Sequence, residues 1–193
     1  MEPRTIFFIG KPGSGKGDQA KLLSKATGWK IVTPGEQFRS MSAEETPVGR
    51  KVKEEMNAGL LLPFWLAEYL FLKNIFSLKD DESIILDGFG RKVPEVEFII
   101  ESLAWLGRSF TMVHLAVSDE EVRHRLTLRK DVEGRADDSA VEERLKEYHE
   151  YTDPAIEKFR GTGNLIEVNG ERTREQIAEE IRAALDIVSP AGR

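Results

Sequence analysis

The sequence predicts an α/β fold in which a parallel sheet of five strands is covered by helices on both faces. Short apolar runs alternate with longer stretches of helical periodicity, which is the pattern of repeated βαβ units. The runs FFI, IIL and MVHLAV are almost continuously apolar, as expected for strands that are buried on both faces. A length of 193 residues is that of one domain, so we expect a single doubly wound domain over 1–193.

The strands and helix starts can be assigned in chain order. We expect strands at 5–9, 30–33, 83–87, 110–117 and 164–168. Four capping-box pairs predict helix starts: Thr33 with Glu36, Ser118 with Glu121, Ser139 with Glu142, and Thr173 with Gln176. Pro34 and Pro47 occupy positions that suit the first residue of a helix. We expect the three tryptophans, Trp29, Trp65 and Trp105, to pack in the core or in an insert.

Two segments depart from the strand–helix rhythm. The segment 34–76 carries the pattern of three successive helices without a strand, and 129–138 reads as a polar loop between two helices. We therefore expect both segments to be inserts on the sheet domain.

Composition excludes several classes of function. The chain has no cysteine, which excludes disulfides, thiolate metal sites and a catalytic thiol, and suits a reducing cytoplasm. Its net charge of −6 argues against nucleic-acid binding. The longest apolar stretch, 58–72, is interrupted by Pro63 and Glu68 and is shorter than the roughly 20 residues of a membrane span. We expect a cytoplasmic protein with neither nucleic-acid nor membrane partners.

A glycine-rich motif follows the first predicted strand. The segment Gly10-Lys-Pro-Gly-Ser-Gly-Lys16 leads into a helix that we expect to begin near Lys16. Glycines allow backbone N–H groups to converge on phosphate oxygens, the helix N-terminus adds positive charge, and the lysine reaches the outer phosphates. The motif predicts a P-loop, with ATP bound by Gly13, Ser14, Gly15, Lys16, Gly17 and Asp18.

Further charged residues are candidates for the same site. Asp87 ends a predicted strand, where a carboxylate could hold the water shell of Mg²⁺; alternatively, it caps the following turn. Gly88-Phe-Gly-Arg91 then forms a tight turn. Five arginines follow within a short stretch, and the simplest interpretation is a solvated, ion-paired helix face: Arg123, Arg125, Arg129, Arg135 and Arg144.

These motifs, taken in order, resemble the adenylate kinases, a family of nucleoside monophosphate kinases. The matching segments are Gly15-Lys-Gly17, Pro34-Gly-Glu-Gln-Phe-Arg39, Ala58-Gly-Leu-Leu-Leu-Pro63, Leu86-Asp-Gly-Phe-Gly-Arg91, Gly134-Arg-Ala-Asp-Asp138, Arg144 through Pro154, and Val168-Asn-Gly170. The resemblance implies a monomer that uses Mg²⁺ and transfers the γ-phosphate of ATP to a monophosphate, with AMP as the expected acceptor.

The resemblance also assigns roles to individual residues. It implies that 34–76 binds the monophosphate and that 129–138 is a short lid. Lys16, Arg91, Arg129, Arg135 and Arg144 would be catalytic. Arg125, Arg129 and Arg172 would also contact ATP. The acceptor would be bound by Pro34, Arg39, Leu62, Gly88, Arg91, Glu95, Arg135 and Arg144.

Three residues depart from the family pattern. Asp18 and Pro34 each stand where the family usually has threonine, and Glu95 stands where glutamine commonly reads adenine. A carboxylate can only accept hydrogen bonds, which would suit guanine better, although Glu95 could equally be a helix-start residue after Pro94. GMP as acceptor, and a nucleotide-binding protein without turnover, are therefore the alternatives.

Overall fold

The computed structural model describes residues 4–133 and 140–187, except for the side chains of 129–133. Its five-stranded parallel sheet has the order β2-β3-β1-β4-β5. The strands are β1 (Thr5–Gly10), β2 (Lys30–Val32), β3 (Ile84–Asp87), β4 (Phe110–Ala116) and β5 (Leu165–Asn169). The predicted fold class is confirmed, and each predicted strand lies within one residue of its observed ends.

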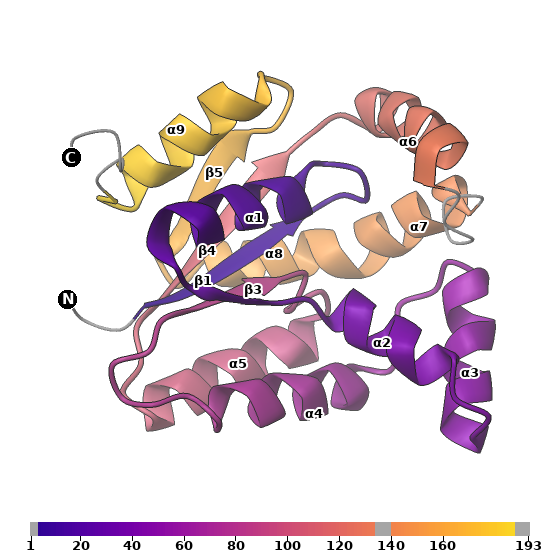
Figure 1. Cartoon of the computed structure of the whole chain (residues 1–193), viewed down its shortest axis with the longest axis horizontal. Helices are drawn as coiled ribbons and strands as arrows, with labels where there is room; N and C mark the ends of the chain where they lie inside the picture. The colour runs from indigo at the N-terminus through magenta and orange to yellow at the C-terminus, as the bar shows by residue number, and fades with distance from the viewer. Residues whose placement is uncertain (1–3, 134–139, 188–193) are drawn as a thin grey trace.

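Helices cover both faces of the sheet (Figure 1). On one face, α1 (Lys16–Thr27) and α9 (Arg174–Ala184) pack over Ile6 and Phe8 of β1. On the other face, Phe7 and Ile9 pack with α4 (Phe64–Ile75), α5 (Val93–Trp105) and α8 (Asp153–Arg160). The continuous apolar run of β1 therefore supplies two separate cores, because successive side chains of a strand point to opposite faces.

An aromatic cluster fills the second core. The ring of Phe7 lies 6.0 Å from that of Phe110, and 6.3 Å from each of the rings of Phe71 and Phe159. These side chains come from β1, β4, α4 and α8, so the cluster joins the sheet to the helices on that face.

Between β2 and β3 the chain forms three helices and no strand, as predicted. They are α2 (Pro34–Ser42), α3 (Pro47–Asn57) and α4, and both predicted prolines occupy first-turn positions. Figure 1 shows α2 and α3 at one end of the molecule, near α7 (Val141–Glu147). A π-helical turn, η2 (Tyr148–Thr152), connects α7 to α8.

The predicted loop 129–138 is wrong over its first half. Helix α6 spans Asp119–Glu133, so 129–133 is helical, while 134–138 lies outside the described residues. The segment Arg129-Lys-Asp-Val-Glu133 contains neither glycine nor proline, and Gly134 is the first strong helix breaker in the sequence.

Of the three predicted capping boxes that lie wholly within the described residues, one forms in full. Thr173 and Gln176 cap the start of α9 reciprocally. Ser118 Oγ accepts the N–H of Glu121, but the N–H of Ser118 donates to Glu171 instead. Thr33 makes no side-chain cap, since Pro34 already starts α2. The N-cap of α7 is Ala140, and Ser139 lies outside the described residues.

The prediction for the tryptophans is correct only for Trp29, which packs against the first core. Trp65 is 57% exposed and Trp105 is 82% exposed. Among the described helices, none is long and apolar enough to cross a membrane.

Candidate functional site

A cavity of about 580 Å³ opens at the carboxyl ends of β1 and β3. Such edges are the usual ligand sites of open parallel sheets. Every predicted site residue whose side chain is described lines this cavity: Gly13, Ser14, Gly15, Lys16, Gly17, Asp18, Pro34, Arg39, Leu62, Asp87, Gly88, Arg91, Glu95, Arg125, Arg144 and Arg172. The side chain of Arg129 and the whole of Arg135 lie outside the described residues.

The P-loop brings the start of α1 into the cavity. Gly15 is the N-cap of α1 with φ of 94°, a left-handed conformation that glycine adopts without steric cost. The ammonium of Lys16 donates to the carbonyls of Gly10 at 2.8 Å and Lys11 at 2.7 Å. The lysine is thereby held against the loop, beside a helix N-terminus that attracts anions.

Asp87 lies beside the P-loop in the position predicted for it. It is only 8% exposed, and a Cβ atom on Gly17 would lie 3.4 Å from its Oδ2. Burial raises the pKa of the Asp87 carboxyl, while the charges of Lys16 and Arg91 oppose the rise. A cation would stabilise the ionised form of a buried carboxylate that lies next to a phosphate cradle. Mg²⁺ typically takes one or two carboxylates and fills its other positions with water and substrate phosphates. The residues therefore fit a hydrated magnesium ion.

The turn after Asp87 is tied together by Glu95. The Oε2 atom of Glu95 accepts the N–H groups of both Gly90 and Arg91 at 2.9 Å. The Nε of Arg91 in turn donates to the Gly88 carbonyl at 2.8 Å. Gly90 has φ of 73°, and a Cβ atom there would lie 2.7 Å from the Phe159 ring, so the turn requires glycine. Burial raises the pKa of the Glu95 carboxyl, although these N–H groups and Arg91 favour its ionised form.

The position of Glu95 is compatible with both interpretations, and base reading stays a prediction. It lies in the first turn of α5 and orders a backbone turn, as a helix-start residue would. It is also buried and lines the cavity, as a base-reading residue would. Because Oε2 is committed to the backbone, recognition of a base would fall to Oε1.

The loop 59–62, which forms another wall of the cavity, is braced from two sides. Glu147 Oε2 accepts the N–H of Leu61 at 2.8 Å. The ammonium of Lys92 donates to the carbonyls of Leu61 at 3.2 Å and Leu62 at 3.3 Å, and lies 5.0 Å from the ring centre of Tyr151. Sequence reasoning missed both bracing residues, because their partners are 30 or more positions away and are backbone atoms.

The arginines divide into two groups. Arg123 pairs with Glu142 in an exposed ion pair and does not line the cavity, which confirms the solvated-face interpretation for that residue. Arg125 donates to the carbonyls of Gly170 at 2.9 Å and Ser14 at 3.4 Å, so it lies beside the P-loop. Arg172 pairs with Glu180 at the cavity edge, and the side chain of Arg144 lies against Gly59.

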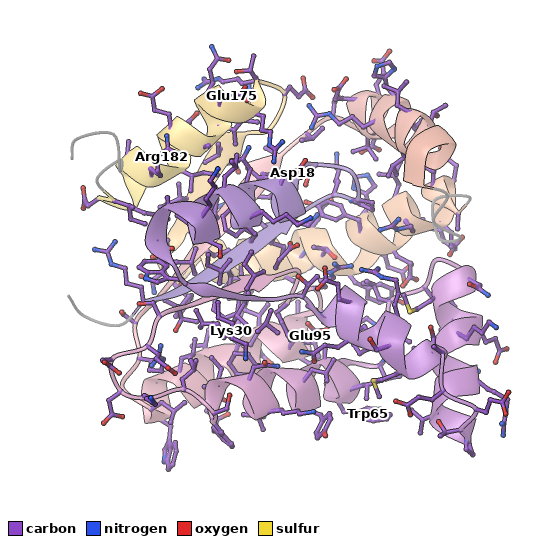
Figure 2. All side chains as sticks on the ribbon, viewed as in Figure 1. Asp18, Lys30, Trp65, Glu95, Glu175 and Arg182 are labelled. Carbon is purple, nitrogen blue, oxygen red and sulfur yellow. The ribbon has the colours of Figure 1, made fainter. Side chains whose placement is uncertain are left out.

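Asp18 lies at the edge of the cavity and faces Arg174. Its carboxylate lies 3.8 Å from the guanidinium of Arg174, and both side chains are more than half exposed. Figure 2 shows Asp18 near the start of α9. The sequence analysis did not select Arg174, which also lines the cavity.

Two further charged residues were missed near Asp87. Glu36 raises the pKa of the Asp87 carboxyl and Lys21 lowers it, and Lys21 lines the cavity. The sequence pattern identifies Glu36 only as a capping partner of Thr33. Glu36 lies two residues after Pro34, in a segment that carries the family resemblance, and this position could have identified it as a candidate site residue.

Comparison with known proteins agrees with this geometry. The model of the adenylate kinase family matches residues 8–164. An adenylate kinase of Thermus thermophilus is 34% identical over 187 residues, which covers 95% of this chain and 98% of that protein. Adenylate kinases of Clavibacter michiganensis (35% identical; 93% and 92% covered) and Bacteroides fragilis (33%; 94% and 97%) are similarly related.

Proposed function

The chain belongs to the adenylate kinase family of nucleoside monophosphate kinases, and from that premise we propose that it transfers the γ-phosphoryl group of ATP to AMP, forming two ADP. The observation that carries the proposal is the shared cavity. The P-loop with Asp87 forms one wall, and Arg39, Arg91 and the loop 59–62 form another. Donor and acceptor can therefore meet in one cavity.

The residues promote transfer by position and charge. Phosphoryl transfer requires little covalent help, so catalysis depends on alignment and on cations placed where the phosphoryl oxygens gain charge. Lys16 and the N-terminus of α1 would hold the donor phosphates. Arg39 and Arg91 would hold the acceptor phosphate, and Arg144 would face the transferred group. The catalytic roles of Arg129 and Arg135 remain predictions.

Magnesium would be held through water by Asp87, and when bound it would neutralise phosphate charge. The apolar part of the cavity wall, with Phe38, Leu62 and Ala67, would exclude water from the acceptor side and so limit hydrolysis of ATP. The lid predicted over 129–138 lies mostly outside the described residues and stays a prediction.

A coupled assay for ADP tests the proposal. Purified protein would receive ATP and Mg²⁺ with AMP, GMP, CMP or UMP, and Lys16→Met would be the inactive control. We expect AMP to give the highest kcat/KM. ATP binding without turnover on any monophosphate would favour the non-catalytic alternative and contradict the proposal.

GMP is the second candidate acceptor, and the buried carboxylate of Glu95 is the observation that favours it. Guanine offers donors at N1 and N2, whereas adenine presents an acceptor at N1, and a mismatched buried acceptor costs about 1–3 kcal/mol. If Oε1 of Glu95 reads the base, Glu95→Gln should raise the AMP-to-GMP ratio of kcat/KM by up to about a hundredfold. Glutamine can still accept the Gly90 and Arg91 N–H groups, so the turn should persist.

The same hypothesis predicts a dependence on pH. Burial raises the pKa of Glu95, and the protonated acid can donate to adenine N1. The wild-type AMP-to-GMP ratio should therefore fall as pH rises through the raised pKa, and the Gln variant should lack this trend. If the AMP-to-GMP ratio of kcat/KM in the Gln variant equals that of the wild type at every pH, Glu95 does not read the base and only holds the turn.

A further inference from the structure

His149 bridges two carboxylates outside the wall of the cavity. Its Nε2 lies 3.0 Å from Oδ2 of Asp119 on α6, and its Nδ1 lies 2.7 Å from Oδ2 of Asp153 on α8. A neutral imidazole has only one N–H donor, so both contacts are hydrogen bonds only when the ring is protonated. The two carboxylates raise the pKa of His149, with Asp153 contributing most. The arrangement therefore favours the charged form of the ring.

His114 shows the opposite arrangement. Its Nδ1 lies 3.3 Å from Glu167, and its Nε2 lies 3.2 Å from the hydroxyl of Tyr148, which can donate, so a neutral ring satisfies both contacts. Burial lowers the pKa of His114, so the two histidines should titrate in separate ranges. Among the described residues, the other charged and titratable groups that act on His149 or Asp119 are Lys11 of the P-loop, Arg123 on α6, Glu142 on α7, Tyr148 on η2 and Asp153 on α8.

Asp119 connects His149 to the P-loop. Oδ1 of Asp119 pairs with the ammonium of Lys11, which also lies 5.8 Å from the ring centre of Tyr148. The carbonyl of Lys11 accepts a hydrogen bond from the ammonium of Lys16 at 2.7 Å. The side chain of Lys11 is therefore anchored behind the loop, while its backbone supports the lysine that would hold the donor phosphates.

We propose that protonated His149 is a positioning residue for ATP, which acts through Asp119 to fix Lys11 and with it the shape of the P-loop. The inference rests on the proposed function, because it takes ATP as the ligand of the P-loop. When the ring loses its proton, it can donate to only one of the two carboxylates. The loss also leaves an excess negative charge beside the loop, which opposes the binding of an anion. Both changes weaken ATP binding.

The dependence on pH has a definite sign. Because the pKa of His149 is raised, the bridge is complete below the ordinary pKa of about 6.5 and is lost as pH rises through the raised value. The side chains of Asp119 and Asp153 are 33% and 48% exposed, so water screens these charges. We therefore expect a change in ATP affinity of about two- to fivefold, as for partly exposed ion pairs.

Calorimetric titration of ATP in Mg²⁺, from about pH 6 to about pH 9, tests the proposal. Glutamine can donate but carries no charge, so His149→Gln imitates the neutral ring. The variant should bind ATP about two- to fivefold more weakly than the wild type at low pH and equally at high pH. Protonation of ATP itself cancels in this ratio of Kd values. His124→Gln, on the exposed surface of α6, is the matched control and should equal the wild type throughout.

A ratio of Kd values that stays constant with pH would overturn the inference while leaving the proposed function intact. If the wild type binds no ATP at any pH, the proposed function fails and the inference fails with it.

Two further variants test the route from His149 to the P-loop. Asp153→Asn removes the strongest support for the proton but leaves Asp119 and Lys11 in place, so ATP affinity should fall at a lower pH. Lys11→Met breaks the link to the loop, so adding His149→Gln to it should change the Kd at no pH. An unmoved midpoint, or a full effect of His149→Gln in the Lys11→Met background, would contradict the route.

Proton NMR gives a readout that needs no nucleotide. The chain has three histidines, so the signal that disappears in His149→Gln identifies the ring. We expect the pKa of His149 to exceed the ordinary value of about 6.5 in the wild type and to fall in Asp153→Asn. A pKa of His149 at or below the ordinary value would reject the bridge.

Discussion

Arg144 contributes a cation to the cavity from the second turn of α7, beside the loop 59–62. If Arg144 stabilises the transferred phosphoryl group, Arg144→Ala should lower kcat by about 10³-fold or more. One such arginine raises the kcat of phosphoryl transfer by roughly 10³- to 10⁵-fold. Steady-state kinetics with ATP and AMP would measure the loss.

The matched control for Arg144 is Arg123→Ala, which removes an exposed arginine outside the cavity. It should keep nearly full activity, and both variants should unfold at nearly the wild-type temperature. If Arg144→Ala keeps more than about a tenth of the wild-type kcat, its activation free energy has risen by less than roughly 1.4 kcal/mol. That result would reject the catalytic role.

Asp18 places a negative charge at the edge of the phosphate cradle. Asp18→Thr removes that charge and supplies a hydroxyl donor, so ATP should bind about three- to tenfold more tightly. The gain should be larger without Mg²⁺, when no cation screens the carboxylate. Calorimetric titration of ATP, with and without Mg²⁺, would measure both effects.

Because Asp18 is exposed and directed toward Arg174, water screens its charge and the effect should stay modest. Glu175→Thr, in the first turn of α9, removes a nearby carboxylate that does not line the cavity and should leave affinity unchanged. Weaker binding by Asp18→Thr in Mg²⁺ would show that Asp18 is a metal partner.

At the scale of elements, the loop between α3 and α4 is held by hydrogen bonds from distant side chains to its backbone atoms. Lys92 at the N-cap of α5 and Glu147 at the end of α7 both bond the loop between α3 and α4. The shape of the cavity wall formed by the loop 59–62 therefore depends on contacts between three segments that are distant in sequence.

Lys92→Met should disturb this loop selectively. Methionine keeps an apolar stem of similar length but loses two hydrogen bonds to Leu61 and Leu62 and the cation over Tyr151. Hydrogen bonds to a charged group contribute roughly 1.5–3 kcal/mol, so KM for AMP should rise about tenfold or more, with little change in KM for ATP. Lys79→Met, on an exposed loop, should change neither constant. Equal increases in both KM values would show general destabilisation instead.

At the scale of the whole molecule, stability rests on two cores that share one sheet. Phe7 is fully buried and belongs to an aromatic cluster from four elements. Phe7→Ala should lower the free energy of unfolding by about 3–5 kcal/mol, through lost burial and the cavity left behind.

For a chain of this length, that loss corresponds to a fall in Tm of about 10 °C. Thermal unfolding followed by circular dichroism would measure it. Val48→Ala removes a half-exposed side chain and should shift Tm by no more than about 2 °C. A similar Tm for both variants would mean that the aromatic cluster contributes little.

The sequence by itself determined the fold class, the order of elements and the P-loop. These features depend on local periodicity and on the backbone conformations that particular residues prefer. Both properties are visible in short segments of the sequence. Pro34 and Pro47, and the glycine motif ending at Lys16, are examples. The resemblance to a family then identified the residues around one cavity without showing how they meet.

The tertiary structure decided what depends on distant partners. Glu147 accepts the N–H of Leu61, 86 positions away, Lys92 bonds carbonyls thirty positions away, and Asp18 faces Arg174 on another helix. The exposure of Trp65 was also beyond the sequence, because an apolar residue at helical spacing looks the same whether or not an element covers it. Burial and long-range hydrogen bonds are properties of the packed molecule, and local sequence pattern does not encode which surface remains open to solvent.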